Sequence, residues 1–329
     1  MSKKKSIKHI LFIGMSGGLA KITAALLLKH YPEIKITGVD SRPFSESSQH
    51  PDPLEKKIKF YQINYTRGQF ESLFRDHQFD AIIHLGRLSH AQADRISLSE
   101  RLDLNLMGTN RILDLALKNK VKKVVILSTF HVYGALNDNP IYMNEDHPLR
   151  ASIKYPELRD VVEMDQIATN WMWRYQGDIQ TVVLRPCNII GPQISNTMTR
   201  YLQAPYAPVP LDFNPMLQFV HEFDMSRVIV ESIFKVPTGV YNVAPEETIA
   251  LRETKRLLDL PSVAVPLVAL EQIARFIKSV WSFPDYLLDY IKYSSVIDGQ
   301  KLIKHIEDEK NQDSFFRFST REAIEHLKK

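Results

Sequence analysis

Short apolar runs alternate with longer, more polar segments along the first half of the chain. The runs are rich in Ile and Val and cover residues 10–13, 34–39, 60–63, 81–85, 124–127 and 181–184. The intervening segments are long enough for crossover helices, which we expect at 21–30, 69–77, 97–118 and 157–175. This alternation predicts an α/β fold with a doubly wound parallel sheet.

The first apolar run ends in a turn where Gly14, Gly17 and Ala20 have the spacing G-x-x-G-x-x-A. Gly14 can form the tight turn, Gly17 lets backbone N–H groups approach a pyrophosphate, and Ala20 allows close packing of the next helix. Asp40, at the end of the second strand, can accept hydrogen bonds from a ribose diol. The pattern predicts a dinucleotide site, with a purely structural turn as the alternative. The Asp40 carboxylate favours NAD because it repels the 2′-phosphate of NADP. Arg42, a cation two residues later, keeps NADP as an alternative cofactor.

The alternation breaks after Pro192, where prolines become frequent. We expect this part of the chain to form a smaller lobe over the carboxyl ends of the strands, where open α/β sheets bind their ligands. Residues 265–293 mix apolar and aromatic side chains. They are expected to form core or a lid over a pocket, and their cationic residues are too sparse for a membrane-surface helix.

Composition narrows the class of protein. The chain has 329 residues, of which 44% are hydrophobic and 24% charged, enough for a large core and unlike a disordered or collagen-like chain. The formal charge is +4, and basic residues are spread along the chain except for Lys3, Lys4, Lys5 and Lys8, so no nucleic-acid partner is expected.

A single cysteine, Cys187, forbids an internal disulfide and is typical of a reducing compartment. No stretch approaches the ~20 apolar residues that span a bilayer, and no His, Cys or Asp cluster has the spacing of metal ligands. We therefore expect a cytoplasmic protein without a membrane span or a metal.

A series of ordered motifs between residues 10 and 244 resembles the extended short-chain dehydrogenase/reductases, the epimerase/dehydratase group. Besides the turn at 14–20, these motifs are H-L-G at 84–86, N-L-M-G-T at 105–109, S-T-F-H-V-Y-G at 128–134, L-R-P-C-N-I-I-G-P at 184–192, F-V-H-E-F-D at 219–224 and G-V-Y-N-V-A at 239–244. The resemblance implies a Rossmann-type dinucleotide-binding domain at 1–192 with a return segment at about 219–244. Residues 193–218 and 245–329 would then form the smaller C-terminal substrate-binding lobe.

The resemblance also implies a set of cofactor-binding residues. Asn64 stands where an aspartate commonly binds the adenine amino group, so adenine would be held differently, and Asn105 has either a structural or a cofactor-orienting role. The implied set is Gly14, Ser16, Gly17, Gly18, Leu19, Ala20, Asp40, Ser41, Arg42, Asn64, Tyr65, Leu85, Gly86, Arg87, Asn105, Leu127, Tyr155, Arg159 and Pro186.

Three residues are implied to be catalytic. Thr129 occupies the position of the family Ser or Thr that hydrogen-bonds the reacting oxygen, and Tyr155 begins the family pattern Y-x-x-x-K, which ends here in Arg159. Helical i, i+4 spacing would place this cation on the face of the tyrosine, where it would stabilise the phenolate; Glu163 also fits the pattern. Arginine keeps the charge but does not reproduce an ammonium group, so activity could survive, weaken or vanish. Pro156 favours extended backbone geometry at the residue before it, Tyr155.

Departures from the family pattern narrow the range of possible substrates. Phe130 and His131 stand where the sugar 4,6-dehydratases have an Asp-Glu pair, which argues against a dehydratase. Leu217 and Gln218 stand near the place where epimerases have an arginine for the nucleotide diphosphate, so a nucleotide sugar is not supported. The apolar lobe favours a lipid-like or steroid-like alcohol or ketone. The candidate substrate-binding residues are Ser89, His131, Asn188 and Arg200.

Two functions follow from these patterns. The first is an NAD(P)-dependent oxidoreductase or epimerase acting on a secondary alcohol or ketone, sugar-like or lipid-like, with Tyr155 exchanging the proton and the nicotinamide exchanging hydride. The alternative is a non-catalytic NAD(P)-binding sensor or assembly protein with a degenerate Tyr-x-x-x-Arg site. The resemblance further implies a homodimer formed through the helices at 97–118 and 157–175.

Overall fold

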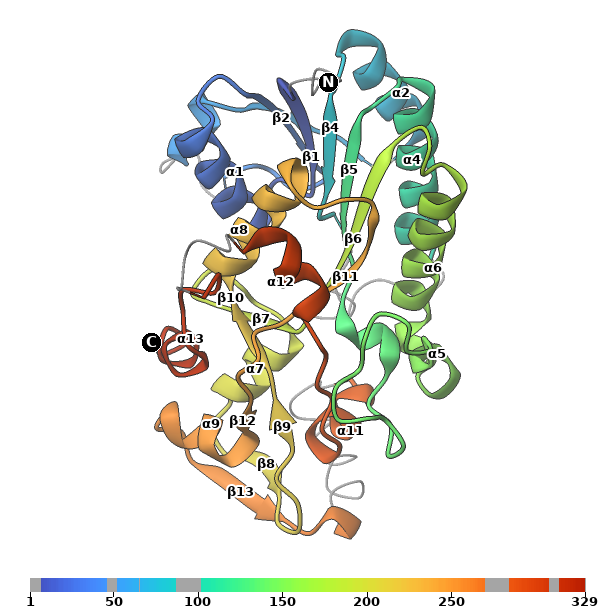
Figure 1. Ribbon diagram of the computed structural model, residues 1–329. Helices are drawn as coiled ribbons and strands as arrows, with labels where there is room; N and C mark the ends of the chain where they lie inside the picture. Colours follow the sequence, from blue (N-terminus) through green and yellow to red (C-terminus); the bar gives the residue numbers. More distant parts are fainter. Residues whose placement is uncertain are drawn as a thin grey trace.

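The computed structural model describes residues 7–45, 52–64, 66–86, 102–269, 284–307 and 314–328. Its central sheet is built from strands β1 (His9–Ile13), β2 (Lys35–Asp40), β3 (Lys59–Gln62), β4 (Ala81–His84), β5 (Lys123–Leu127), β6 (Gln180–Pro186) and β11 (Gly239–Val243). The strands are parallel and lie in the order β11-β6-β5-β4-β1-β2-β3 (Figure 1). The predicted doubly wound parallel sheet is confirmed, and each predicted apolar run contributes a strand.

The strand order reverses between β1 and β4. The chain first runs outward through β2 and β3, then returns to the other side of β1 and continues outward through β4, β5, β6 and β11. The last residue of β1, Ile13, therefore pairs with Val39 on one side and with His84 on the other. The connections diverge at this point and leave a crevice at the carboxyl ends of the strands, where open α/β sheets bind ligands.

Helices cover both faces of the sheet (Figure 1). One layer contains α1 (Gly18–His30), α8 (Glu222–Phe234) and α12 (Gln300–Ile306), and the other contains α2 (Arg67–Asp76), α4 (Gly108–Lys118) and α6 (Arg159–Arg174). Successive strand residues point to opposite faces, so Ile10 and Phe12 of β1 join the first core while Leu11 and Ile13 join the second. Both faces are buried, which explains why the strands are almost continuously apolar.

Two of the predicted helical segments are broken near their start by short turns. In the described part of the 97–118 segment, a π-helical turn, η3 (Asp103–Met107), precedes α4. In the 157–175 segment, a short helix α5 (Ala151–Lys154) and a 3-10 turn η5 (Pro156–Leu158) precede α6. Pro156 lacks an N–H group and cannot continue α5, so Tyr155 is not in the helix that contains Arg159.

A smaller group of elements, drawn in the lower part of Figure 1, adjoins the carboxyl ends of the strands. Its two-stranded sheets pair β7 (Asn188–Ile190) with β10 (Phe219–His221), β8 (Ala207–Pro210) with β13 (Ser262–Val265), and β9 (Met216–Leu217) with β12 (Ile249–Ala250). Its helices are α7 (Thr197–Gln203), α9 (Leu251–Leu257), α11 (Tyr286–Lys292) and α13 (Thr320–Glu325). Tyr201, Leu202, Phe219, Leu251 and Ile324 belong to a separate buried cluster, so this group has a core of its own. The remaining short turns are η1 (Pro53–Lys56) and η4 (Phe130–Tyr133).

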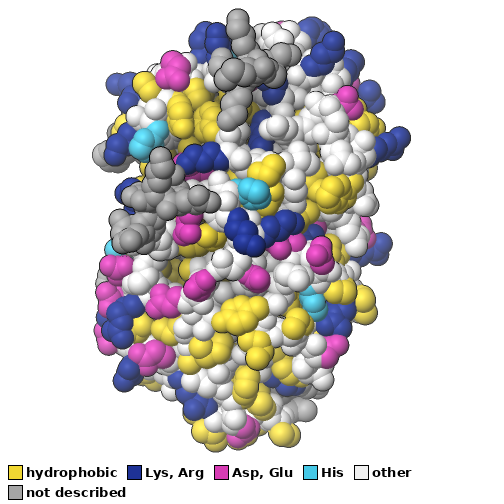
Figure 2. Space-filling view, in the orientation of Figure 1, with side chains coloured by type: hydrophobic (Ala, Val, Ile, Leu, Met, Phe, Trp, Pro, Cys, Tyr) yellow, Lys and Arg dark blue, Asp and Glu magenta, His cyan; other side chains and the backbone are white. Residues whose placement is uncertain are grey.

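Hydrophobic side chains gather on the lower half of the face shown in Figure 2, over the region that holds β8, β9 and α9 in Figure 1. Tyr206, Leu211 and Val263, in or beside β8 and β13, are exposed. Lys and Arg are dispersed over the visible face (Figure 2). Among the helices of the described ranges, none has the length and hydropathy needed to cross a bilayer.

Candidate cofactor and active site

The glycine-rich turn connects β1 to α1 and has the geometry of an anion cradle. Gly14 has a φ of 86°, and a Cβ there would lie 2.6 Å from the backbone of Gly86. Its N–H donates to the carbonyl oxygen of Val39 at 2.9 Å, which fixes the turn against the end of β2. Gly17 is the N-cap of α1 and supplies no side-chain cap. The first N–H groups of a helix have no acceptor inside it, and a pyrophosphate is well suited to accept from them.

Asp40 is buried at the end of β2 and reaches back to the same turn. One carboxylate oxygen accepts from the N–H of Ser16 and the other from the N–H of Arg42, each at 3.0 Å. The Arg42 guanidinium lies 3.4 Å from the carboxylate, and the Ser16 hydroxyl donates to the carbonyl oxygen of Arg42 at 3.1 Å. A carboxylate held beside a pyrophosphate cradle is positioned for a ribose diol, so these residues fit a dinucleotide.

The other predicted cofactor residues fall into two groups. Gly18, Leu19 and Ala20 open α1, while Leu85, Gly86, Leu127 and Pro186 lie at the carboxyl ends of β4, β5 and β6. Ser41 and Asn64 are exposed beyond β2 and β3. Asn105 is buried and donates to the Asp160 carboxylate at 2.9 Å, which ties η3 to α6. Tyr65, Arg87 and Ser89 lie outside the described residues.

A cavity of about 250 Å³ lies at the carboxyl ends of β4, β5 and β6. Three of the residues predicted to be catalytic or to bind substrate, Thr129, His131 and Asn188, line it, whereas Arg200 is an exposed residue of α7. The apolar lining comprises Leu85, Leu127, Leu158, Val161, Pro186, Ile189, Ile194 and Met198. The other side chains of the lining are Ser128, Cys187, Asn196, Thr197 and Tyr286.

Thr129 and His131 form a pair at the start of η4, immediately after β5. Thr129 is the N-cap of this turn, and its hydroxyl oxygen lies 2.8 Å from Nδ1 of His131 and accepts from the His131 N–H at 3.3 Å. The imidazole packs against the ring of Tyr290, with the ring centres 4.7 Å apart, and edge-on against Tyr286 at 5.7 Å. The pair is therefore held both by the turn and by α11.

Tyr155 does not line the cavity. Its side chain is buried, and its hydroxyl donates a hydrogen bond to the carboxylate of Asp289 in α11. The ammonium group of Lys154 pairs with the same carboxylate at 2.5 Å. Burial and the hydrogen bond to Asp289 raise the pKa of the Tyr155 phenol well above its usual range. In this structure the phenol ties α5 to α11.

Arg159 lies on the exposed surface of α6 and pairs with Glu163 one helical turn later. The pairing of Tyr155 with Arg159 expected from helical spacing is therefore not formed. The reason is local: Pro156 and the turn η5 separate the two residues, so the i, i+4 rule does not apply between them. Leu158 and Val161 take the places beside the cavity, so this segment presents an apolar surface to it.

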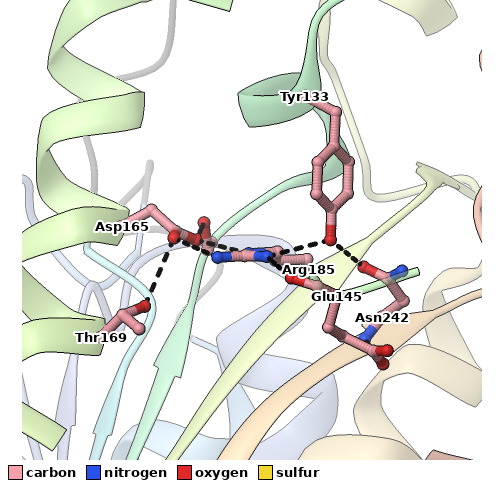
Figure 3. A network of polar contacts seen from close by, with 7 residues as sticks. Tyr133, Glu145, Asp165, Thr169, Arg185 and Asn242 are labelled. Atoms are coloured by element: carbon pink, nitrogen blue, oxygen red, sulfur yellow. Dashed lines mark hydrogen bonds and ion pairs between the residues drawn. The ribbon is translucent and has the colours of Figure 1, made fainter. Parts of the chain in front are cut away.

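A buried polar network anchors α6 to the sheet beside the cavity (Figure 3). The Arg185 guanidinium donates to both oxygens of Asp165, at 3.0 and 2.6 Å, and to the hydroxyl of Tyr133 at 3.0 Å. Tyr133 in turn donates to Asn242 in β11 at 2.7 Å, and burial raises the pKa of its phenol to about 12. Ser128, which lines the cavity, donates to the Asp165 carboxylate. The network fixes the position of α6 relative to the ends of β5 and β6.

Several lining residues were not predicted from the sequence. Tyr286 comes from the aromatic segment expected to form core or a lid, and its hydroxyl donates to Thr197 in α7 at 3.2 Å. Asn196 caps α7 by accepting from the N–H of Thr199. In the described ranges, no cluster of three or more His, Cys, Asp or Glu is arranged to hold a metal ion.

Comparison with known proteins gives a family and several relatives. The model of the NAD dependent epimerase/dehydratase family matches residues 10–244. An uncharacterized protein of Mycobacterium tuberculosis is 26% identical over 211 residues, which cover 64% of this chain and 56% of that protein. Mouse dTDP-D-glucose 4,6-dehydratase is 24% identical over 188 residues, covering 56% of this chain and 51% of the enzyme. The matched region thus spans about half the length of these curated relatives.

Solved structures are similar over nearly the whole chain. The dTDP-glucose 4,6-dehydratase of Bacillus anthracis, solved in complex with NAD, has a TM-score of 0.71 at 18% identity and covers 97% of this chain and 95% of its own. The UDP-glucose 4-epimerase of Thermotoga maritima, solved with UDP-glucose, has the same TM-score and identity and covers 97% of both chains. At this identity the similarity shows the fold.

Proposed function

We propose a function from one premise: the chain belongs to the NAD dependent epimerase/dehydratase family, whose cofactor is NAD. The protein is an NAD-dependent oxidoreductase or epimerase that acts on a secondary alcohol or ketone of a small molecule. When bound, the nicotinamide supplies the chemistry of hydride transfer. The protein supplies the cradle for the dinucleotide, the cavity for the reacting carbon and a group that exchanges the hydroxyl proton.

One observation carries this proposal: the dinucleotide cradle and the cavity that contains Thr129 lie along the same edge of one sheet. Gly14, Gly17 and Asp40 are at the ends of β1 and β2, and Thr129 is at the end of β5. The turn would hold the pyrophosphate, Asp40 the adenine-side ribose, and the cavity the nicotinamide end with the substrate. Thr129 would hydrogen-bond the reacting oxygen.

A specific observation favours a second function, a non-catalytic NAD-binding sensor or assembly protein. The phenol of Tyr155 is tied to Asp289, and Leu158 and Val161 present apolar side chains to the cavity. The catalytic roles that the family resemblance implies for Tyr155 and Arg159 would require the phenol to leave that carboxylate. A protein that only senses the cofactor would need the cradle and no proton-exchange group.

Calorimetric titration of the cofactor-stripped protein with NAD and with NADP tests the cradle. We expect NAD to bind at one site per chain and more tightly than NADP, because Asp40 repels the 2′-phosphate; no binding of either would contradict the proposal. Turnover is then tested with UDP-glucose, dTDP-glucose and simple secondary alcohols, by the near-ultraviolet absorbance of reduced nicotinamide and by NMR analysis of the products. Thr129→Val should abolish any turnover found. NAD binding without reaction of any of these compounds would favour the sensor.

The homodimer and the cytoplasmic location stay predictions. Met107 in η3 and Trp173 in α6 are large exposed apolar side chains on elements that pack together, which supports an interface there. Sedimentation velocity at micromolar concentration, with Trp173→Glu as the comparison, should show a dimer that the variant weakens.

A further inference from the structure

The cavity needs a group that exchanges a proton near neutral pH. The described part of its lining offers three titratable side chains: His131, Cys187 and Tyr286. Cys187 is buried, and burial raises the pKa of its thiol, which keeps it protonated. Tyr286 donates its hydroxyl proton to Thr197. Phenols as a class are weak acids that keep this proton at neutral pH. Imidazole is the side chain whose ordinary pKa lies closest to neutrality. The chemistry of the lining therefore points to His131.

His131 is also held in the way that a proton-exchange group requires. Its Nδ1 lies 2.8 Å from the Thr129 hydroxyl oxygen, and its backbone oxygen accepts from the Tyr290 hydroxyl at 3.1 Å. The titratable groups packed against the ring from α11 are the phenols of Tyr286 and Tyr290, and burial raises the pKa of Tyr290. A histidine held through Nδ1 can present Nε2 as the atom that takes or gives a proton.

Among the described residues, the η5–α6 segment brings no proton-exchange group to the cavity. Leu158 and Val161 are the residues that the η5–α6 segment contributes to the lining, and neither can exchange a proton. Tyr155, the residue implied by the family pattern, is hydrogen-bonded to Asp289 and does not line the cavity. Within the described part of the lining, the group suited to proton exchange is therefore His131, which follows β5.

We propose that His131, positioned by Thr129, is the proton-exchange residue of the cavity in place of Tyr155. This inference rests on the proposed function. In alcohol oxidation, Nε2 of His131 takes the hydroxyl proton while the hydrogen on carbon leaves with its electron pair to NAD⁺, so that the alcohol becomes a ketone and NAD⁺ becomes NADH. In the reverse direction the imidazolium returns the proton to the oxygen.

NMR titration of the histidine side chains tests the inference without a substrate. The Cε1–H signal of His131, identified by its loss in His131→Asn, is followed against pH in the free protein and in its NAD⁺ and NADH complexes. The oxidised nicotinamide is cationic, so an imidazolium beside it is disfavoured. We expect the titration midpoint of His131 to be about one pH unit lower with NAD⁺ than with NADH. His9, at the amino end of β1, is the matched control and should not differ.

The possible results separate this inference from the proposed function. No calorimetric binding of NAD by the wild type contradicts the proposed function and removes the basis of the inference. Binding of NAD together with the same His131 midpoint in both complexes overturns the inference alone. The Tyr155→Phe variant gives an independent check. Its His131 titration midpoint should still differ between the NAD⁺ and NADH complexes, and loss of this difference would mean that Tyr155 is part of the proton-exchange site. With a substrate in hand, His131→Asn should lower kcat at least about 100-fold and Tyr155→Phe less than about threefold.

Discussion

The two halves of the candidate site are held in different ways. The cradle around Gly14 and Asp40 depends on backbone geometry: a positive φ, a close approach to Gly86 and N–H groups at the start of α1. The segment from Ala151 to Glu163 depends instead on where side chains point, and that is decided by a proline and by Asp289 from a distant part of the chain. Backbone geometry can be inferred from local spacing, whereas side-chain direction in a broken helix cannot.

Helix α6 repeats this contrast on a smaller scale, because it carries two arginine–carboxylate pairs. Asp165 pairs with Arg185 in the interior, and both side chains are almost completely buried. Arg159 pairs with Glu163 on the exposed surface. The buried pair anchors the helix beside the cavity, and the exposed pair is the remnant of the pattern expected to be catalytic.

The largest expected effect comes from breaking the buried pair. Asp165→Asn leaves the Arg185 charge uncompensated in the interior, which should lower the free energy of unfolding by about 3–5 kcal/mol. Urea denaturation followed by circular dichroism measures it. Glu163→Gln is the matched control and should cost less than about 1 kcal/mol, since exposed pairs contribute little. Equal losses in the two variants would contradict the assigned roles of the two pairs.

The next effect is a pH dependence at His84, which lies between the two halves at the end of β4. Burial lowers the pKa of its imidazole to about 4, against about 6.5 in an unfolded chain. The unfolded state therefore binds the proton first, and His84 makes the native state less stable as the pH falls below about 6.5. Urea denaturation measures the free energy of unfolding at pH 7 and at pH 5. Between these two pH values, it should fall by up to about 2 kcal/mol more in the wild type than in His84→Gln. An identical pH dependence in both proteins would exclude this contribution.

A smaller effect is expected at Asp40. Asp40→Asn keeps an acceptor for one backbone N–H but removes the charge that would bind the ribose diol, so NAD affinity should fall about tenfold, or roughly 1.4 kcal/mol. Calorimetric titration measures this change. Arg42→Ala should alter NAD affinity less than about twofold, because the guanidinium is half exposed. A loss as large in Arg42→Ala as in Asp40→Asn would move the ribose contact to the arginine.

The smallest effect is expected at residue 159, although the family pattern implies that this residue is catalytic. Arg159→Lys restores the family residue, yet Arg159 is exposed and pairs only locally, so NAD affinity and any turnover should stay within about twofold and stability within about 0.5 kcal/mol. Calorimetry, product analysis and urea denaturation of the same preparation measure all three. A large gain in turnover would mean that the arginine limits the chemistry and that residue 159 reaches the site.

The contrast between the two halves also explains what could be read from the sequence. The parallel sheet and the glycine-rich turn have local signals: the apolar strand runs, the spacing of Gly14, Gly17 and Ala20, and Asp40 at a strand end. The predicted NAD cofactor agrees with the family. The placement of Tyr155 could not be read, because its partner Asp289 is 134 residues away. Pro156 was the one local sign that the helical spacing would fail. Tyr286 reaches the cavity from an aromatic segment that gave no more specific sign than core or lid.

A crystal structure of the protein with NAD would show directly whether the η5–α6 segment faces the cavity with Leu158 and Val161 while Tyr155 stays hydrogen-bonded within the framework. We predict a nicotinamide ring in contact with these two side chains, His131 and Thr129 on the opposite side, and the Tyr155 hydroxyl still on Asp289. A Tyr155 hydroxyl within about 3.2 Å of the nicotinamide ribose or of the Thr129 hydroxyl would instead make the tyrosine the proton-exchange residue.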